Sequence, residues 1–83
     1  MDDAYDLIGA VPKNAAEEVR IALSEFRGAS LIDLRIFADL GDGERRPTKK
    51  GLALRIDRLP ELIAALERAR TEAERRGLIG GGE

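Results

Sequence analysis

The chain has 83 residues, a formal net charge of −2, no cysteine and no histidine. This length makes one domain, which buries only a modest part of its surface alone, so a partner subunit is expected. Without thiols and imidazoles, disulfides, cysteine nucleophiles, histidine bases and the usual zinc ligands are excluded. The carboxylates give no sign of a water-poor cleft, so we expect no catalytic site, no metal and no cofactor.

The chain carries no signal for a membrane or for export. No segment approaches the roughly 20 apolar residues that a membrane helix needs. The first ten residues hold three aspartates, where a signal peptide has positive charge. We therefore expect a cytoplasmic protein, associated with the nucleoid if the source is bacterial, and no membrane partner.

The N-terminal half predicts a lead-in followed by a strand. Residues 1–14 mix acids with a few apolar residues and end in the turn-favouring "VPKN", so they are interpreted as a partly flexible lead-in. The segment "EEVRIALSEF", residues 17–26, alternates apolar and polar side chains, as a half-buried strand does. Gly28 then supplies the positive φ that a tight hairpin requires.

A second strand is predicted for "SLIDLRIFA", residues 30–38. Its apolar face is formed by Ile32, Leu34 and Ile36. Its other face carries Asp33, Arg35 and Phe37. We expect this second face to stay open, with an exposed aromatic ring beside a charge, because a single helix covers only part of one face of a sheet.

A third extended region follows the turn signal "LGDGE". It begins with the basic segment, "RRPTKK" at residues 45–50, and continues into the alternating "GLALRI". Pro47 belongs on an edge or at a bulge, because it has no N–H for the ladder. Residues 45–58 hold six Lys or Arg against Asp57 alone, so an acidic chain has a basic region.

The period changes to about 3.6 after Asp57, which predicts one C-terminal amphipathic helix. Its apolar stripe packs on the sheet or, alternatively, contacts a second copy of the chain: Leu59, Leu62, Ile63 and Leu66. Arg75 and Arg76 before Gly77 are typical of a helix end. Residues 15–77 are thus predicted to form the domain, and residues 78–83 a flexible tail. The predicted class is α+β, with a meander of antiparallel strands before the helix.

The basic segment has two interpretations. Its cations could simply keep an edge strand soluble and unpaired. Alternatively, a stiff cationic strip near Arg35 and the ring of Phe37 suits a flexible single strand of nucleic acid, because cations neutralise phosphates and rings stack on bases. No helix resembles a recognition helix for the major groove.

From Pro12 to about Ala69 the sequence resembles the bacterial branch of the transcriptional positive cofactor four family. The resemblance rests on the order and spacing of "PKN", "EEVRIALSEFRG", "IDLRIF", "DGE", "RPTKKG", "LAL" and "LPELIAALERA". It implies a homodimer in which each subunit has a curved antiparallel sheet of four strands, with the helices at the dimer interface. It also implies binding of single-stranded DNA with little sequence preference, in transcription regulation, replication or repair.

Carried over residue by residue, the resemblance makes Phe26 a base-stacking ring. It also implies that five cations contact the nucleic-acid backbone: Arg27, Arg35, Arg46, Lys49 and Lys50. Gly28, Pro47 and Gly51 match as residues that shape the chain. The sequence pattern adds Phe37 and Arg45 to the candidate nucleic-acid-binding residues.

This chain departs from the family pattern at three positions. Ala38 and Arg45 stand where relatives often have rings, and Ala29 stands where they have a cation. Each missing ring forfeits about 1 to 3 kcal/mol of stacking, so we expect weaker and more salt-sensitive binding. RNA remains an alternative ligand, and the transcription machinery is a further expected partner. The alternative function is a protein-interaction module that docks an acidic segment of a polymerase or regulator.

Overall fold

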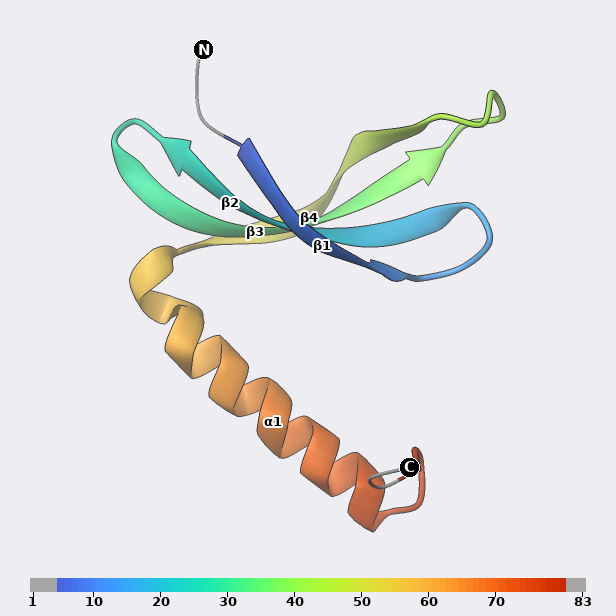
Figure 1. Cartoon of the computed structure of the whole chain (residues 1–83), viewed down its shortest axis with the longest axis vertical. Helices are drawn as coiled ribbons and strands as arrows, with labels where there is room; N and C mark the ends of the chain where they lie inside the picture. Colours follow the sequence, from blue (N-terminus) through green and yellow to red (C-terminus); the bar gives the residue numbers. More distant parts are fainter. Residues whose placement is uncertain (1–4, 81–83) are drawn as a thin grey trace.

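The computed structural model describes residues 5–80 and shows one antiparallel sheet followed by one helix (Figure 1). The strands lie in chain order across the sheet. The elements are β1 Tyr5–Pro12, β2 Glu17–Phe26, β3 Ala29–Asp39, β4 Arg45–Arg55, the 3₁₀ turn η1 Ile56–Arg58, and α1 Leu59–Arg75. The predicted α+β class, with four curved antiparallel strands and a C-terminal helix, is confirmed.

The predicted lead-in is wrong for Tyr5–Pro12, which forms the edge strand β1. It pairs with β2 from Tyr5 opposite Ser24 to Pro12 opposite Glu18. The register shifts between Leu7 and Gly9, and this irregularity breaks the alternation by which a strand is recognised in a sequence. The first part of the predicted lead-in, residues 1–4, lies outside the described residues.

The β2–β3 connection is a hairpin with a two-residue loop, as the glycine predicted. Phe26 pairs with Ala29, and the residues between them, Arg27 and Gly28, have φ angles of 52° and 81°. Two positive φ angles are the requirement of a type I′ turn, whose twist matches that of the flanking strands. The hairpin thereby sets the register of β2 against β3, which is unbroken to Glu17 opposite Ala38.

The pairing of β3 with β4 is interrupted by a bulge between Pro47 and Gly51. Arg35 pairs with Gly51, whereas Phe37 pairs with Pro47, so β4 has the longer path between these two pairs. The Thr48 hydroxyl donates to the carbonyl of Ile36 at 2.8 Å and so holds the bulge closed. A Cβ at Gly51 would lie 2.4 Å from the carbonyl oxygen of Leu34.

The sheet has an apolar face and a polar face, as the alternation predicted. The apolar face consists of Val19, Ile21, Leu23, Ile32, Leu34, Ile36, Leu52 and Leu54. The polar face includes Glu18, Arg20, Phe26, Asp33, Arg35 and Phe37. Arg45 of β4 reaches across β3 to Glu18 of β2, at 2.8 Å. Because side chains of non-neighbouring strands meet there, the polar face is the inside of the curve, and Figure 1 shows the strand ends rising away from α1.

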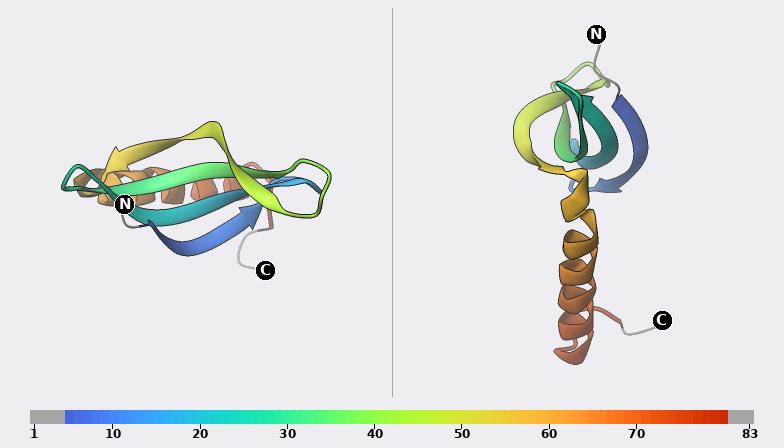
Figure 2. Two further views of the ribbon diagram at one scale, coloured as in Figure 1. Left: turned by 90° about the horizontal axis from the view of Figure 1, so that it is seen from above. Right: turned by 90° about the vertical axis from the view of Figure 1, so that its left-hand side faces the viewer.

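Helix α1 projects from the sheet as a straight rod (Figure 2). The prediction that its apolar stripe packs on the sheet is wrong for the single chain, because Ile63 is 47% exposed and Leu66 57%. Leu59 and Leu62 are half-buried near the base of the helix. The turn η1 directs the chain away from β4, so the 17 residues of α1, about 25 Å long, pass beyond the sheet.

The end of α1 follows the prediction. Gly77 has a φ of 74° and donates to the carbonyl of Glu74, while Leu78 donates to that of Ala73. These two bonds form a Schellman motif, which satisfies carbonyls that the helix leaves open. Residues 78–80 follow without regular structure. In the described part of the chain no helix has the length and apolarity to cross a membrane.

Candidate nucleic-acid interface

The centre of the polar face is an ordered group of ionic side chains around Phe37. The Cζ atom of Arg20 lies 4.1 Å from the centroid of the Phe37 ring. Glu18 accepts hydrogen bonds from Arg20 and Arg45, and Arg45 also donates to the carbonyl of Ala15 at 3.0 Å. The group therefore ties β2, β3 and β4 together on the inside of the curve.

Phe37 lies on the predicted face, but the prediction that its ring is exposed is wrong. Only 8% of the residue is accessible, because the guanidinium of Arg20 covers the ring. Such a cation over a ring is worth about 0.5 to 2 kcal/mol, depending on its solvation. In this state the ring itself is not open to a base.

Arg35 forms a second ion pair beside this group. Its Nη2 atom donates to Asp33 at 2.9 Å, and its Nη1 atom is 3.4 Å from the carbonyl oxygen of Thr48. Asp33 is 6% exposed, so the carboxylate is buried, whereas the Arg35 side chain is 27% exposed. The hydrogen bond to Asp33 raises the pKa of Arg35 further above its already high ordinary value.

Arg20 and Arg35 stand directly opposite each other in the β2–β3 ladder. Like charges at such positions destabilise a sheet. Each guanidinium is partly compensated by a carboxylate two residues away, Glu18 or Asp33. With Arg45, the middle of the polar face holds three arginines against two carboxylates, and this positive excess favours an anionic ligand.

Phe26 and Arg27 lie at the end of the β2–β3 hairpin. Phe26 is 51% exposed, and the Cζ atom of Arg27 is 5.0 Å from the centroid of its ring. An exposed ring beside a cation is suited to stacking on a base while the cation meets a phosphate. The role that the sequence assigned to this pair stays a prediction, and its geometry is compatible with that role.

The basic segment does not act as one block of free cations. Arg45 is bound to Glu18, and Arg46 forms ion pairs with Asp42 at 2.7 Å and Glu44 at 3.0 Å. Within residues 5–80, Lys49 and Lys50 form no ion pair shorter than 4.0 Å. The two lysines are therefore the cations of this segment that remain available to phosphates.

The predicted residues are spread along the sheet. Arg45 and Arg46 begin β4 beside the end of β3, whereas Phe26 lies at the opposite end of the sheet, in the β2–β3 hairpin (Figure 1). Arg35 lies between them, paired with Gly51. The structure therefore brings Arg35 to the second half of the basic segment and leaves Phe26 remote from its first half.

Three residues in or beside the central group were not among the predicted site residues: Glu18, Arg20 and Asp33. The hairpin at Arg27 and Gly28 is the sequence feature from which their positions in the β2–β3 ladder can be predicted. A two-residue loop fixes the register, so counting outward from it pairs Arg20 with Arg35 and Glu18 with Phe37.

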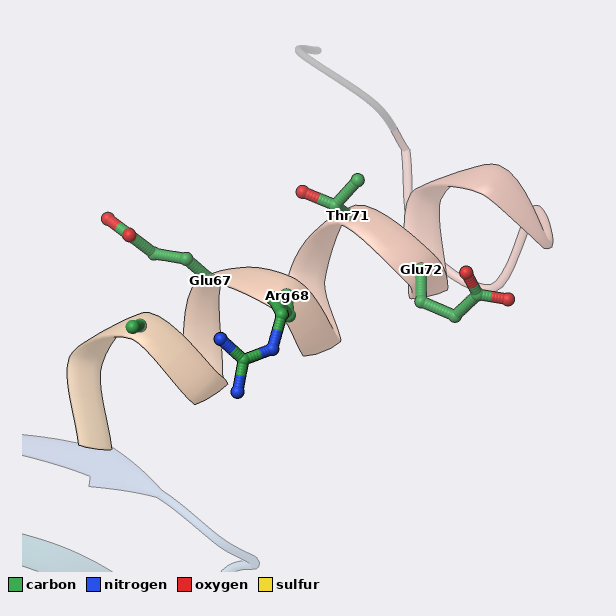
Figure 3. A pocket seen from close by; sticks show the side chains of 5 residues that line it. Glu67, Arg68, Thr71 and Glu72 are labelled. Atoms are coloured by element: carbon green, nitrogen blue, oxygen red, sulfur yellow. The ribbon is translucent and has the colours of Figure 1, made fainter. Parts of the chain in front are cut away.

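The helix offers no comparable site. A hollow beside α1 is lined by Ala64, Glu67, Arg68, Thr71 and Glu72. Figure 3 shows that the labelled side chains leave the same helix in different directions and do not converge on one point. Nor do residues 5–80 contain a group of three acidic or other metal-ligating side chains that would hold an ion.

Glu18 makes the stability of the polar face depend on pH. The hydrogen bond from Arg20, with the charges of Arg20 and Arg45, holds the pKa of Glu18 below its usual range. Because folding lowers this pKa, the contribution is present above the ordinary glutamate pKa of about 4.3 and is lost as the pH falls through the lower folded value.

We expect Glu18→Gln to weaken the acid dependence of stability between about pH 5 and pH 3. Urea denaturation across this range measures the effect. Wild type should lose stability more steeply than the variant as the pH falls. Parallel pH profiles for the two proteins would contradict the role given to Glu18.

A family model described as Transcriptional Coactivator p15 (PC4) matches residues 13–65. The chain belongs to the PC4 family. The matched residues span β2, β3 and β4 and reach into α1, so they include the whole central group of the polar face. Strand β1 lies outside the match. A comparison with curated proteins finds no match.

Solved structures of PC4 proteins share the fold. BPSL1147, a PC4 homolog from Burkholderia pseudomallei, is 30% identical in its orthorhombic form, with a TM-score of 0.74, covering 84% of this chain and 95% of that chain. The bacteriophage T5 homolog, implicated in recombination-dependent DNA replication, is 28% identical, with a TM-score of 0.62 and coverages of 89% and 83%. MoSub1, solved as a DNA complex, is 26% identical, with a TM-score of 0.60 and coverages of 83% and 85%.

Proposed function

We propose that this PC4 protein is a homodimer that binds single-stranded DNA across its polar faces with little sequence preference. The observation that carries the proposal is the concave polar face, where cations and the exposed ring of Phe26 lie on one side of a curved sheet. Membership of the PC4 family and the DNA complex of MoSub1 support it. A role in transcription regulation, replication or repair follows from such an activity.

The proposed dimer is supported by what the single chain leaves uncovered. In the described part, the buried apolar residues are Ala22, Ile32, Phe37 and Ala38, which make a very small core. Chains of this size bury a smaller fraction of their surface than larger domains do, so a partner adds a large share of the burial. Because the polar face is the inside of the curve and the strand ends rise away from α1 (Figure 1), the apolar face lies on the side of α1, whose stripe is also exposed. A second copy would cover both.

The proposed DNA binding is tested by titrating labelled oligothymidine against wild type and the double variant Lys49→Ala, Lys50→Ala at several salt concentrations. We expect weaker binding by the variant and a shallower slope of log affinity against log salt. The slope should change by about 1.4, because each neutralised phosphate of a single strand contributes about 0.7.

The matched control is Arg68→Ala, Arg75→Ala, which removes the same charge from α1. It should leave the affinity close to that of wild type. Equal affinities of wild type and the lysine variant would refute the assignment of the basic segment. Duplex DNA bound as tightly as a single strand of equal length would refute the role of Phe26. Failure to bind any oligonucleotide, with a protein partner captured after nuclease treatment, would favour an interaction module.

A further inference from the structure

Above Phe37, the surface that a ligand would meet is a guanidinium plane. The ring is buried, and the Arg20 guanidinium lies over it with Cζ 4.1 Å from the centroid. The Arg20 side chain is 27% exposed. Bases of single strands stack on the planes of arginine guanidinium groups as well as on aromatic rings.

The plane is held in place before a ligand arrives. The Nε atom of Arg20 donates to Glu18, and Glu18 is fixed in turn by Arg45 at 2.8 Å. Arg45 is anchored to the carbonyl of Ala15. A group that is already ordered loses little entropy on binding, so its contact contributes more of its energy to affinity.

The neighbouring arginine, Arg35, has a different role from Arg20. The donors of Arg35 are directed to Asp33 and to the carbonyl of Thr48, so its charge is partly compensated by an ion pair. Because Arg35 stands opposite Arg20, it places a positive charge beside the guanidinium plane. A nucleotide at this position would meet a flat surface for its base beside a partly compensated positive charge.

We propose that Arg20, stacked on Phe37, is a base-stacking platform of the polar face. This role rests on the proposed binding of single-stranded DNA. Arg20 and Phe26 lie on the same side of β2, six residues and about 20 Å apart, so a strand that crosses the face meets two stacking surfaces. The platform compensates for the absence of rings at Ala38 and Arg45.

The test compares oligothymidine with an abasic oligonucleotide of the same length, for wild type and Arg20→Lys. Lysine keeps the charge and loses the plane. We expect wild type to prefer oligothymidine and Arg20→Lys to lower this preference about tenfold. The ratio of the two affinities is measured on one preparation, so any loss of folded protein cancels.

Arg68→Lys is the control, because it makes the same substitution at an arginine of α1, outside the candidate interface, and it should leave the ratio unchanged. An unchanged ratio in Arg20→Lys would overturn the platform, since Arg20 would then act through charge alone. Failure of the proposed function gives a different result, in which wild type binds neither oligonucleotide.

Discussion

Replacing Ile63 and Leu66 by aspartate is expected to dissociate the proposed dimer. Both side chains are about half exposed in the single chain, and nothing in the described sheet covers them. Full burial of such a side chain contributes about 1.5 kcal/mol or more, and a homodimer would bury the exposed half of four of them, so association should weaken by about 3 kcal/mol, a hundredfold or more in the dissociation constant. Light scattering over a dilution series measures the change in mass.

The matched control is Ala64→Asp, Thr71→Asp, which adds the same negative charge on the polar side of α1. It should remain dimeric at concentrations at which Ile63→Asp, Leu66→Asp is monomeric. The monomeric variant should also unfold more readily, because its apolar sheet face loses its cover. If both double variants elute with the same mass as wild type, the stripe is not the interface.

The sequence predicts the last three strands of the sheet well because each has one apolar face. Alternation identifies β2, β3 and β4 without knowledge of their neighbours. Strand β1 escapes this reasoning, since the irregularity between Leu7 and Gly9 breaks the period. Its place in the sheet depends on pairing with β2, and no local pattern encodes that pairing.

The helix shows a second limit of sequence reasoning. Periodicity in α1 identifies an apolar stripe, and Gly77 identifies the end of the helix. The pattern indicates that the stripe is buried against another surface, but it does not identify that surface. In the single chain the sheet does not bury the stripe, because η1 directs α1 away from β4 (Figure 2).

In the candidate site, the sequence predicts which residues are charged but not which charges are paired with each other. The sequence places Arg35 and Phe37 correctly on the polar face, but it does not show that Arg20 covers the ring. Likewise, Arg45 is neutralised by Glu18, which is 27 positions away in the chain. A cluster of cations in a sequence therefore gives an upper limit to the cations that a ligand can use.

Gly51→Ala is expected to destabilise the protein strongly. The new Cβ would lie 2.4 Å from the Leu34 carbonyl oxygen and 2.8 Å from the Cα of Arg35, both backbone atoms that cannot turn aside. The φ of 147° adds strain for any residue with a side chain. We expect a loss of about 3 kcal/mol or more, which lowers the melting temperature by about 12 °C or more for a domain of this size.

Two controls separate the contact from the backbone strain. Gly43 has a φ of 84° and open space around its Cβ position, so Gly43→Ala measures the strain alone and should cost about 1 kcal/mol. Gly9→Ala meets neither difficulty and should be close to neutral. Thermal unfolding at one protein concentration compares all three variants. An equal melting temperature for Gly51→Ala and Gly43→Ala would mean that β4 can move away from β3 at the bulge. The close approach that places Arg35 beside Thr48 would then not be required for the fold.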